Sequence, residues 1–126
     1  IGRVEARFSG VVCSYGSVTG TPKTFVEIAV FRYDVRRIVD SIYAAQAALN
    51  RANPSVRWHR WPALGRRAFS EAVVSEGKSN VSVYIAEGRE RLVLHLGGVN
   101  GDPDSLSAEA SKVARRAWGR WKGASR

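Results

Sequence analysis

Between residues 80 and 98, apolar and polar side chains alternate in two runs that are joined by a short glycine-containing link. The apolar positions are Val81, Val83, Ile85, Leu92, Leu94 and Leu96. Side chains two residues apart lie on the same face of a strand, so each run predicts a strand with one buried face. We interpret Glu87-Gly88 as the centre of a tight turn, which predicts that the two strands form an antiparallel hairpin.

Three other segments also predict strands. Residues 10–17 and 24–33 are rich in β-branched and aromatic side chains, and Gly20, Thr21 and Pro22 between them predict a turn. Residues 67–76 form a third β-prone run, which the link "GKS" connects to the hairpin. We expect all of these strands to belong to one sheet.

The apolar period changes from two to 3.6 after Asp34 and again after Asp102 and Asp104, which predicts two helices. Asp34 is the expected N-cap of the first helix, which should end near residue 50. Either Asp102 or Asp104 can cap the last helix, with Pro103 in its first turn. The expected apolar stripes are Val35, Ile38, Val39, Ile42, Ala45 and Leu49 in the first helix, and Leu106, Ala110, Val113, Ala114, Ala117 and Trp121 in the last. Residues 54–65 show neither period and are expected to form a loop.

The element order is therefore ββαβββα. It predicts an α+β fold, with a single antiparallel sheet of about five strands and both helices packed on one face. The chain length of 126 residues fits one domain, 1–126, and the balance of 44% apolar and 25% charged residues is that of a folded globular protein. No run is long enough to span a bilayer. Because the chain starts at Ile1 and contains no methionine, we expect it to be a processed product or an excised domain that lacks an N-terminal segment.

The sheet face away from the helices is expected to be partly aromatic and partly polar. Four of its side chains are candidates for binding a ligand or a protein partner, namely Phe31, Tyr33, Tyr84 and His95. Aromatic rings provide a large contact area at a low cost in conformational entropy. The alternative is a plain exposed sheet surface, or a face covered by residues outside this chain.

Candidate catalytic groups are few. Cys13 could pair with His59 or His95, but a thiol within an apolar strand is expected to be inert and structural. Glu27 and Glu71 could share a sheet face as an acid–base pair, although each is more typical of a solvated strand residue. The only soft metal ligands, Cys13 and the two histidines, do not have zinc-site spacing. We therefore expect no catalytic residues, no metal and no cofactor, and a protein that is not an enzyme.

Basic residues dominate the charge, with a formal net charge of +9 from 20 basic and 11 acidic residues. They gather in two tracts with interleaved tryptophans, residues 57–67 and 112–126. The candidate basic surface consists of Arg57, Arg60, Arg66, Arg67, Arg115, Arg116 and Arg120. Such a surface could bind nucleic acid or anionic lipid. Against this, the tryptophans are more typical of packed residues, and sixteen arginines against four lysines also match the bias of a GC-rich genome.

Several short motifs together resemble a known group of proteins. They are Cys13-Ser14-Tyr15, the strand entry Leu64-Gly65-Arg66-Arg67-Ala68-Phe69, the strand pair "VSVYIAEGRERLVLHL" and an alanine-rich final helix. In these features the chain resembles small secreted or lipid-anchored proteins of actinobacteria, which include domains of unknown function and extracellular sensor-like domains. The resemblance implies export, anchoring through an upstream lipid-modified cysteine or membrane helix, and no established catalytic machinery. It also implies that Cys13 pairs with a cysteine in a preceding segment, which this chain lacks.

Taken together, these features predict a non-enzymatic, extracytoplasmic domain of a secreted or membrane-anchored protein, which binds a small-molecule ligand or a protein partner. The alternative is a basic module that binds nucleic acid or an anionic surface, with nucleic acid as the weaker of the two expectations.

Overall fold

The computed structural model describes residues 8–16 and 25–124. In chain order its elements are β1 (Phe8–Gly16), β2 (Phe25–Tyr33), α1 (Arg36–Ala52), β3 (Arg57–Arg60), the short 3-10 helix η1 (Pro62–Leu64), β4 (Ala68–Ser75), β5 (Lys78–Glu87), β6 (Glu90–Val99) and α2 (Pro103–Ala124). The turn predicted at Gly20, Thr21 and Pro22 lies outside the described residues, as do the last two residues of the second basic tract.

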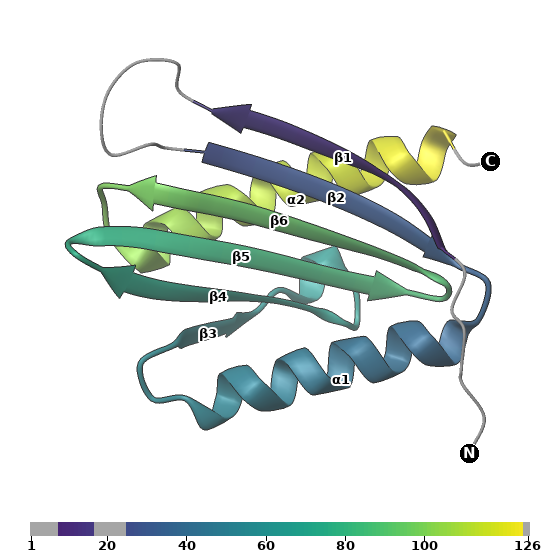
Figure 1. Cartoon of the computed structure of the whole chain (residues 1–126), viewed down its shortest axis with the longest axis horizontal. Coiled ribbons are helices and arrows are strands. Elements are labelled where there is room, and N and C mark those ends of the chain that lie inside the picture. Colours follow the sequence, from purple (N-terminus) through teal and green to yellow (C-terminus); the bar gives the residue numbers. More distant parts are fainter. Residues whose placement is uncertain (1–7, 17–24, 125–126) are drawn as a thin grey trace.

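All six strands form one antiparallel sheet with the order β1-β2-β6-β5-β4-β3 (Figure 1). A single antiparallel sheet with two helices confirms the predicted α+β class. The sixth strand, β3, lies in the segment for which we predicted a loop. It is four residues long and pairs with β4 on one side only, so it is too short to show the alternation that identifies a strand.

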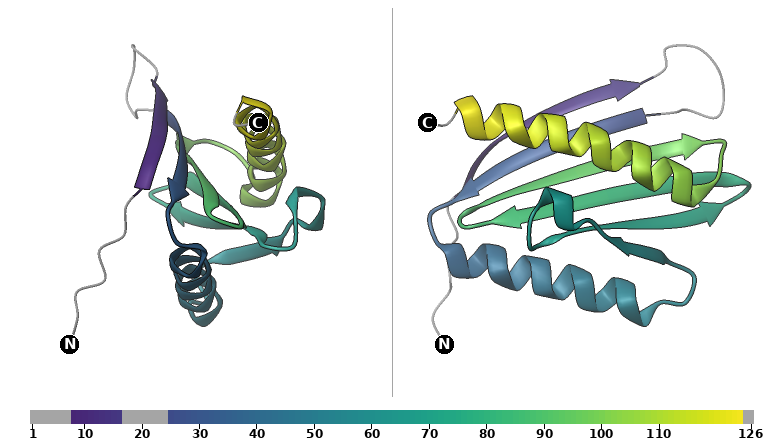
Figure 2. Two further views of the ribbon diagram at one scale, coloured as in Figure 1. Left: turned by 90° about the vertical axis from the view of Figure 1, so that its right-hand side faces the viewer. Right: turned by 180° about the vertical axis from the view of Figure 1, so that it is seen from behind.

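The two helices lie on opposite faces of the sheet. Figure 2 (left) shows the sheet nearly end-on, with α1 on one side and α2 on the other. Buried side chains agree, because Val39 of α1 packs with Tyr33 and Ala86, whereas Ala114 of α2 packs with Val83 of the other sheet face. The prediction that both helices pack on one face is therefore wrong. An apolar stripe shows that a helix covers a sheet but not which face it covers.

The face covered by α2, here called the α2 face, carries the main core. Its buried members are Val30, Leu64, Ala68, Ala72, Val81, Val83, Ile85, Leu92, Leu94, Ala110, Ala114 and Trp118. The apolar alternation of β5 and β6 supplies the centre of this cluster, as predicted from the sequence. Leu64 of η1 and Trp61 pack against the same cluster, so the segment after β3 seals one edge of the core.

The opposite face, here called the α1 face, carries two smaller clusters under α1. One joins Tyr33, Val39 and Ala86, and the other joins Phe69, Tyr84 and Val93. The buried stripe of α1 differs from the predicted one, because Leu49 is 72% exposed while Tyr43 packs edge-on against Phe69 at 5.4 Å between ring centroids. On this aromatic part of the sheet, Tyr43 of α1 therefore makes the packing contact that we expected of Leu49.

Candidate functional site

The four predicted binding residues all lie on the α1 face, but they are not equally accessible. Tyr33 and Tyr84 are only 7% and 8% exposed, whereas Phe31 and His95 are half-buried. Tyr33 belongs to the end of the sheet that α1 covers, where the guanidinium of Arg91 lies 4.7 Å from the Phe31 ring centroid and its Nε donates to Tyr33 Oη at 2.9 Å. Neither tyrosine therefore exposes enough of its ring to contact a ligand.

A row of polar side chains crosses the same face next to these rings. The pairing register places Glu71 of β4 opposite Ser82 of β5, Ser82 opposite His95 of β6, and His95 opposite Glu27 of β2. We call these four residues the polar row. All four are half-buried, and Phe25, which lies two residues before Glu27 on the same face of β2, is 45% exposed. The polar row therefore lies on a partly exposed region of the α1 face, as far as the described residues show.

Hydrogen bonds organise the polar row from within the sheet. Ser82 Oγ and His95 Nδ1 share a hydrogen bond of 2.7 Å, and Tyr84 Oη donates to Glu71 Oε1 at 2.8 Å. The Tyr84 ring meets the His95 imidazole edge-on at 6.3 Å between centroids. Burial raises the pKa of Tyr84 to about 12, and the hydrogen bond to the Glu71 carboxylate acts in the same direction. Tyr84 is thus a neutral donor that fixes the Glu71 carboxylate.

The two carboxylates of the polar row are too far apart to act as an acid–base pair. Glu71 and Glu27 lie three strand spacings apart, which is about 14 Å between their backbones. Paired carboxylates in glycoside hydrolysis lie roughly 5–9.5 Å apart. The prediction that Glu27 and Glu71 could share a sheet face is confirmed, but they lie at opposite ends of the polar row.

The cysteine and the histidines also occupy separate positions. Cys13 lies on β1 and His59 on β3, which are the two opposite edges of the sheet. His95 faces Glu27 in the register, and the residue of β1 opposite Glu27 is Ser14. The side chain of Cys13 lies outside the described part of the structure. The backbone pairing thus gives Cys13 no direct partner among the two histidines.

The seven residues of the predicted basic surface fall into two groups. Arg57, Arg60, Arg66 and Arg67 surround β3 and η1, and Arg115, Arg116 and Arg120 lie exposed on the outer side of α2. In the first group, Arg57 forms an ion pair with Asp104 at 2.9 Å and Arg67 forms one with Asp40. This group is therefore partly neutralised.

Asp104 lies at the start of α2 and holds β3 to it. His59 Nε2 and Arg57 Nη1 each lie 2.9 Å from one of its carboxylate oxygens. The hydrogen bond from His59 is the main cause that lowers the pKa of Asp104, and Arg57 lowers it further. The neighbouring Trp61 donates from Nε1 to Ser70 Oγ at 2.8 Å, which confirms that it anchors the segment after β3.

Three members of the polar row, Glu27, Glu71 and His95, were named singly as candidates from the sequence, but the alignment of the row was not predicted. The available signal was the register of the β5–β6 hairpin. Glu87 pairs with Glu90, so the two turn residues are Gly88 and Arg89, one position later than the centre that we predicted. Gly88 has a φ of 58°, as the first central residue of such a turn requires. The correct centre places Ser82 opposite His95.

Among the described residues, no group of three or more His, Cys, Asp or Glu side chains is arranged to hold a metal ion. Neither helix in the same part of the chain has the length and apolar character needed to cross a membrane. No protein-family model, curated protein or solved structure matches the chain.

Proposed function

We propose that this protein is a non-enzymatic domain that binds a ligand or a protein partner through the polar row on its α1 face. The observation that carries the proposal is the alignment of Glu71, Ser82, His95 and Glu27 across four adjacent strands, on a partly exposed region of the face. A row built on paired strands is held rigidly, so little entropy is lost when a partner binds.

The chemistry of the polar row favours an extended partner rich in hydrogen-bond donors. Its two ends, Glu27 and Glu71, are acceptors, and its centre carries a hydroxyl group and an imidazole. The exposed Phe25 ring lies across Gly97, where a Cβ atom would come within 2.3 Å of it, and adds apolar area beside the row. A basic polypeptide segment carries groups that can contact both the carboxylates and the ring.

The contact between Ser82 and His95 raises the alternative of a nucleophile and its base. Acyl transfer also needs backbone N–H groups that stabilise an oxyanion. Ser82 lies within β5 and is paired with β4 on one side and β6 on the other, so its neighbouring N–H groups belong to the sheet ladder. This geometry favours binding over catalysis.

Titration of ¹⁵N-labelled protein with tetralysine and tetraglutamate tests the proposal by NMR. At about 150 mM salt the net charge is largely screened beyond roughly 8 Å, so contacts to Glu27 and Glu71 should dominate. We expect tetralysine to shift the amides of β2, β4, β5 and β6 near the polar row, and tetraglutamate to leave them unchanged.

A matched pair of variants decides whether the polar row is responsible. Replacing both row carboxylates, E27Q/E71Q, should weaken tetralysine binding at least fivefold. The control E76Q/E109Q removes two exposed carboxylates elsewhere and should leave binding unchanged. Equal loss in both variants, or peptide hydrolysis that disappears in H95A, would contradict the proposal.

The extracytoplasmic location is the part of the proposal that rests on the resemblance to secreted and lipid-anchored actinobacterial domains. An upstream export signal with a lipid-attachment cysteine, found in the full gene, would support it. A start codon directly before Ile1, with the protein in the cytosolic fraction, would contradict it.

A further inference from the structure

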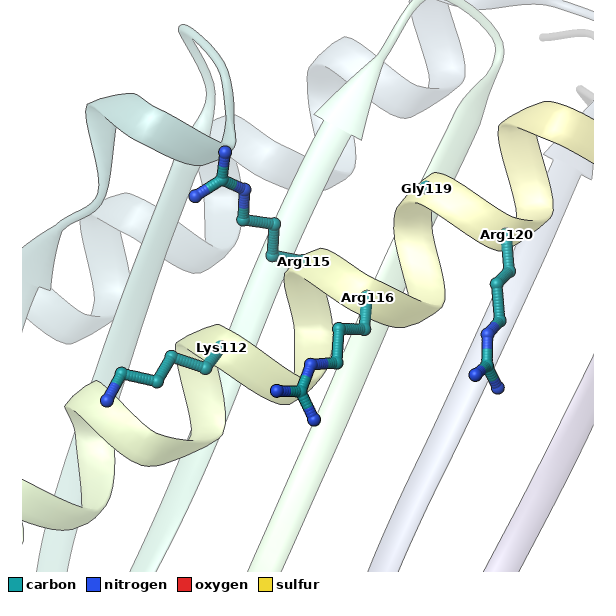
Figure 3. Close-up of a pocket in the computed structure, with 5 residues that line it drawn as sticks. All are labelled: Lys112, Arg115, Arg116, Gly119 and Arg120. Atoms are coloured by element: carbon teal, nitrogen blue, oxygen red, sulfur yellow. The ribbon is translucent and has the colours of Figure 1, made fainter.

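The outer surface of α2 carries an open groove of about 620 Å³ that is lined almost entirely by cations. We call it the α2 groove. The residues that line it are Lys112, Arg115, Arg116, Gly119 and Arg120 (Figure 3). Their spacing of three, four and eight residues places them on one face of the helix, along about 12 Å of its axis. Figure 3 shows Arg116 and Arg120 extending to one side of the helix and Arg115 to the other.

The positive charge of the α2 groove is hardly neutralised by the protein. Among the described residues, Arg115, Arg116 and Arg120 form no ion pair. Lys112 has one, with Glu109 at 3.3 Å, and both of those side chains are 68% exposed. Arg116 and Arg120 lie one helical turn apart and repel each other, which an anionic ligand would relieve.

Gly119 lies in the lining of the α2 groove between the arginines. Glycine inside a helix costs up to about 1 kcal/mol relative to alanine, and apart from the adjacent backbone of α2 itself no described atom lies within 4 Å of the place where a Cβ would stand. Packing within the chain therefore does not require glycine here. Its effect is to lower the floor of the α2 groove, so that a ligand can approach the helix backbone closely.

From these observations we infer that the α2 groove binds the phosphodiester backbone of a nucleic acid. Arginine binds phosphate oxygens through two parallel N–H groups, and the groove carries three arginines. Its length of about 12 Å corresponds to the rise of three or four nucleotides of one strand along the B-DNA axis, at ~3.4 Å per nucleotide. A chain of phosphates fits this spacing better than a single phosphate, which would need converging donors.

The shape of the surface favours a strand over a membrane. A lipid surface is broad and touches the most protruding side chains, whereas these cations lie on both sides of an open hollow that runs along the helix. The nearby rings are also engaged in the protein, because Trp118 is 6% exposed and Trp121 donates its Nε1–H to Glu90. No ring of the groove is therefore free for base stacking, and we expect binding to be independent of sequence.

Fluorescence anisotropy with two labelled 20-base-pair duplexes of unrelated sequence tests this inference. With three or four phosphate contacts, the slope of log K against log salt should lie between about −2.7 and −3.6. The affinity for both duplexes should then fall about 40- to 150-fold between 50 and 200 mM salt. Affinity that salt does not weaken, or that depends strongly on sequence, would overturn the inference.

Two double variants separate the α2 groove from the net charge. R116A/R120A should reduce the magnitude of the salt slope by about 2, because each arginine accounts for one phosphate contact. R37A/R89A removes the same charge from exposed positions outside the groove and should leave the slope nearly unchanged. Equal changes in both variants would show that only the net charge matters, and would contradict a site on α2.

A glycine pair tests the close approach to the helix. G119A should raise the melting temperature by about 2–5 °C and still weaken duplex binding. G123A is the matched control, since Gly123 is also open to solvent on α2 but lies outside the groove, and it should leave binding unchanged. Unchanged binding in G119A, or binding of anionic phosphatidylserine vesicles through the same arginines without binding of DNA, would overturn the assignment.

Discussion

Tyr84 shows how burial and one carboxylate set the chemistry of a single residue. Its ring stacks on Phe69 at 4.9 Å between centroids, and its hydroxyl group donates to Glu71. Burial, followed by the hydrogen bond to Glu71, raises the pKa of Tyr84 from its ordinary value of 10.0 to about 12. The folded protein therefore keeps this hydroxyl group neutral over a range of pH in which an unfolded tyrosine ionises.

This difference predicts an alkaline loss of stability. The raised pKa contributes its full stabilisation below pH 10, and the contribution falls as the pH rises from 10 towards 12, because only the unfolded chain then releases the proton. Between pH 9 and 11.5, the wild type should lose roughly 1–2 kcal/mol of unfolding free energy relative to Y84F. Urea unfolding of both proteins measures this loss, and a difference that stays constant with pH would show that Tyr84 ionises normally.

At the scale of single elements, α2 begins with one of the two caps that the sequence allowed. Asp102 is the cap, since its Oδ2 accepts the Ser105 N–H at 2.9 Å and its carbonyl oxygen accepts the Leu106 N–H at 3.0 Å. Pro103 is the first residue of the helix, as predicted. Asp104 is instead engaged by β3, through Arg57 and His59. Spacing alone could not separate these two aspartates, because both precede the apolar stripe.

The cap assignment predicts how α2 responds to substitution. D102A should lower the free energy of unfolding by about 1 kcal/mol, because the Ser105 N–H loses its acceptor, while D102N should retain much of that stability. Thermal unfolding of both variants and of D104A, which keeps the cap, measures the difference. A D102A protein as stable as the wild type would assign the cap to another residue.

How well each strand could be predicted from the sequence depended on the length of the strand and on the burial of its side chains. β5 and β6 were predictable because each is ten residues long and carries three alternating apolar side chains that face one core. β3 was not, because four residues at a sheet edge give too short a pattern. The polar row was missed for a different reason, since moving the turn by one position shifts the pairing by two residues and leaves every side chain on its correct face. The faces were therefore right while the neighbours were wrong.

The arrangement of the whole molecule follows from a sheet that is apolar on both faces at one end. β2 directs Val30 towards α2 and Tyr33 towards α1. Because both faces carry apolar side chains at this end of the sheet, each face is covered by a helix. The α1 face loses this apolar character towards Glu27 and His95, and there the polar row stays partly exposed. The sequence could show that two helices exist but not that the sheet lies between them.

The unequal cores predict unequal stability of the two helices. In α1, Val39 is the one fully buried side chain among those described, whereas α2 buries Ser107, Ala110, Ala114 and Trp118. We expect native-state hydrogen exchange at low denaturant to show α1 amides opening at a lower free energy than amides of α2, β5 and β6.

Two core variants give this prediction a direct test. V39A should lower the protection of α1 alone, because its contacts lie in the small cluster with Tyr33 and Ala86. L94A, in the main core, should cost about 2–5 kcal/mol and lower the protection of every element together. A different result would show that both faces fold as one cooperative unit. In that case the α1 amides exchange only through global unfolding, and V39A does not lower their protection separately. If α1 does open separately, the aromatic cluster beside the polar row becomes accessible without loss of the sheet.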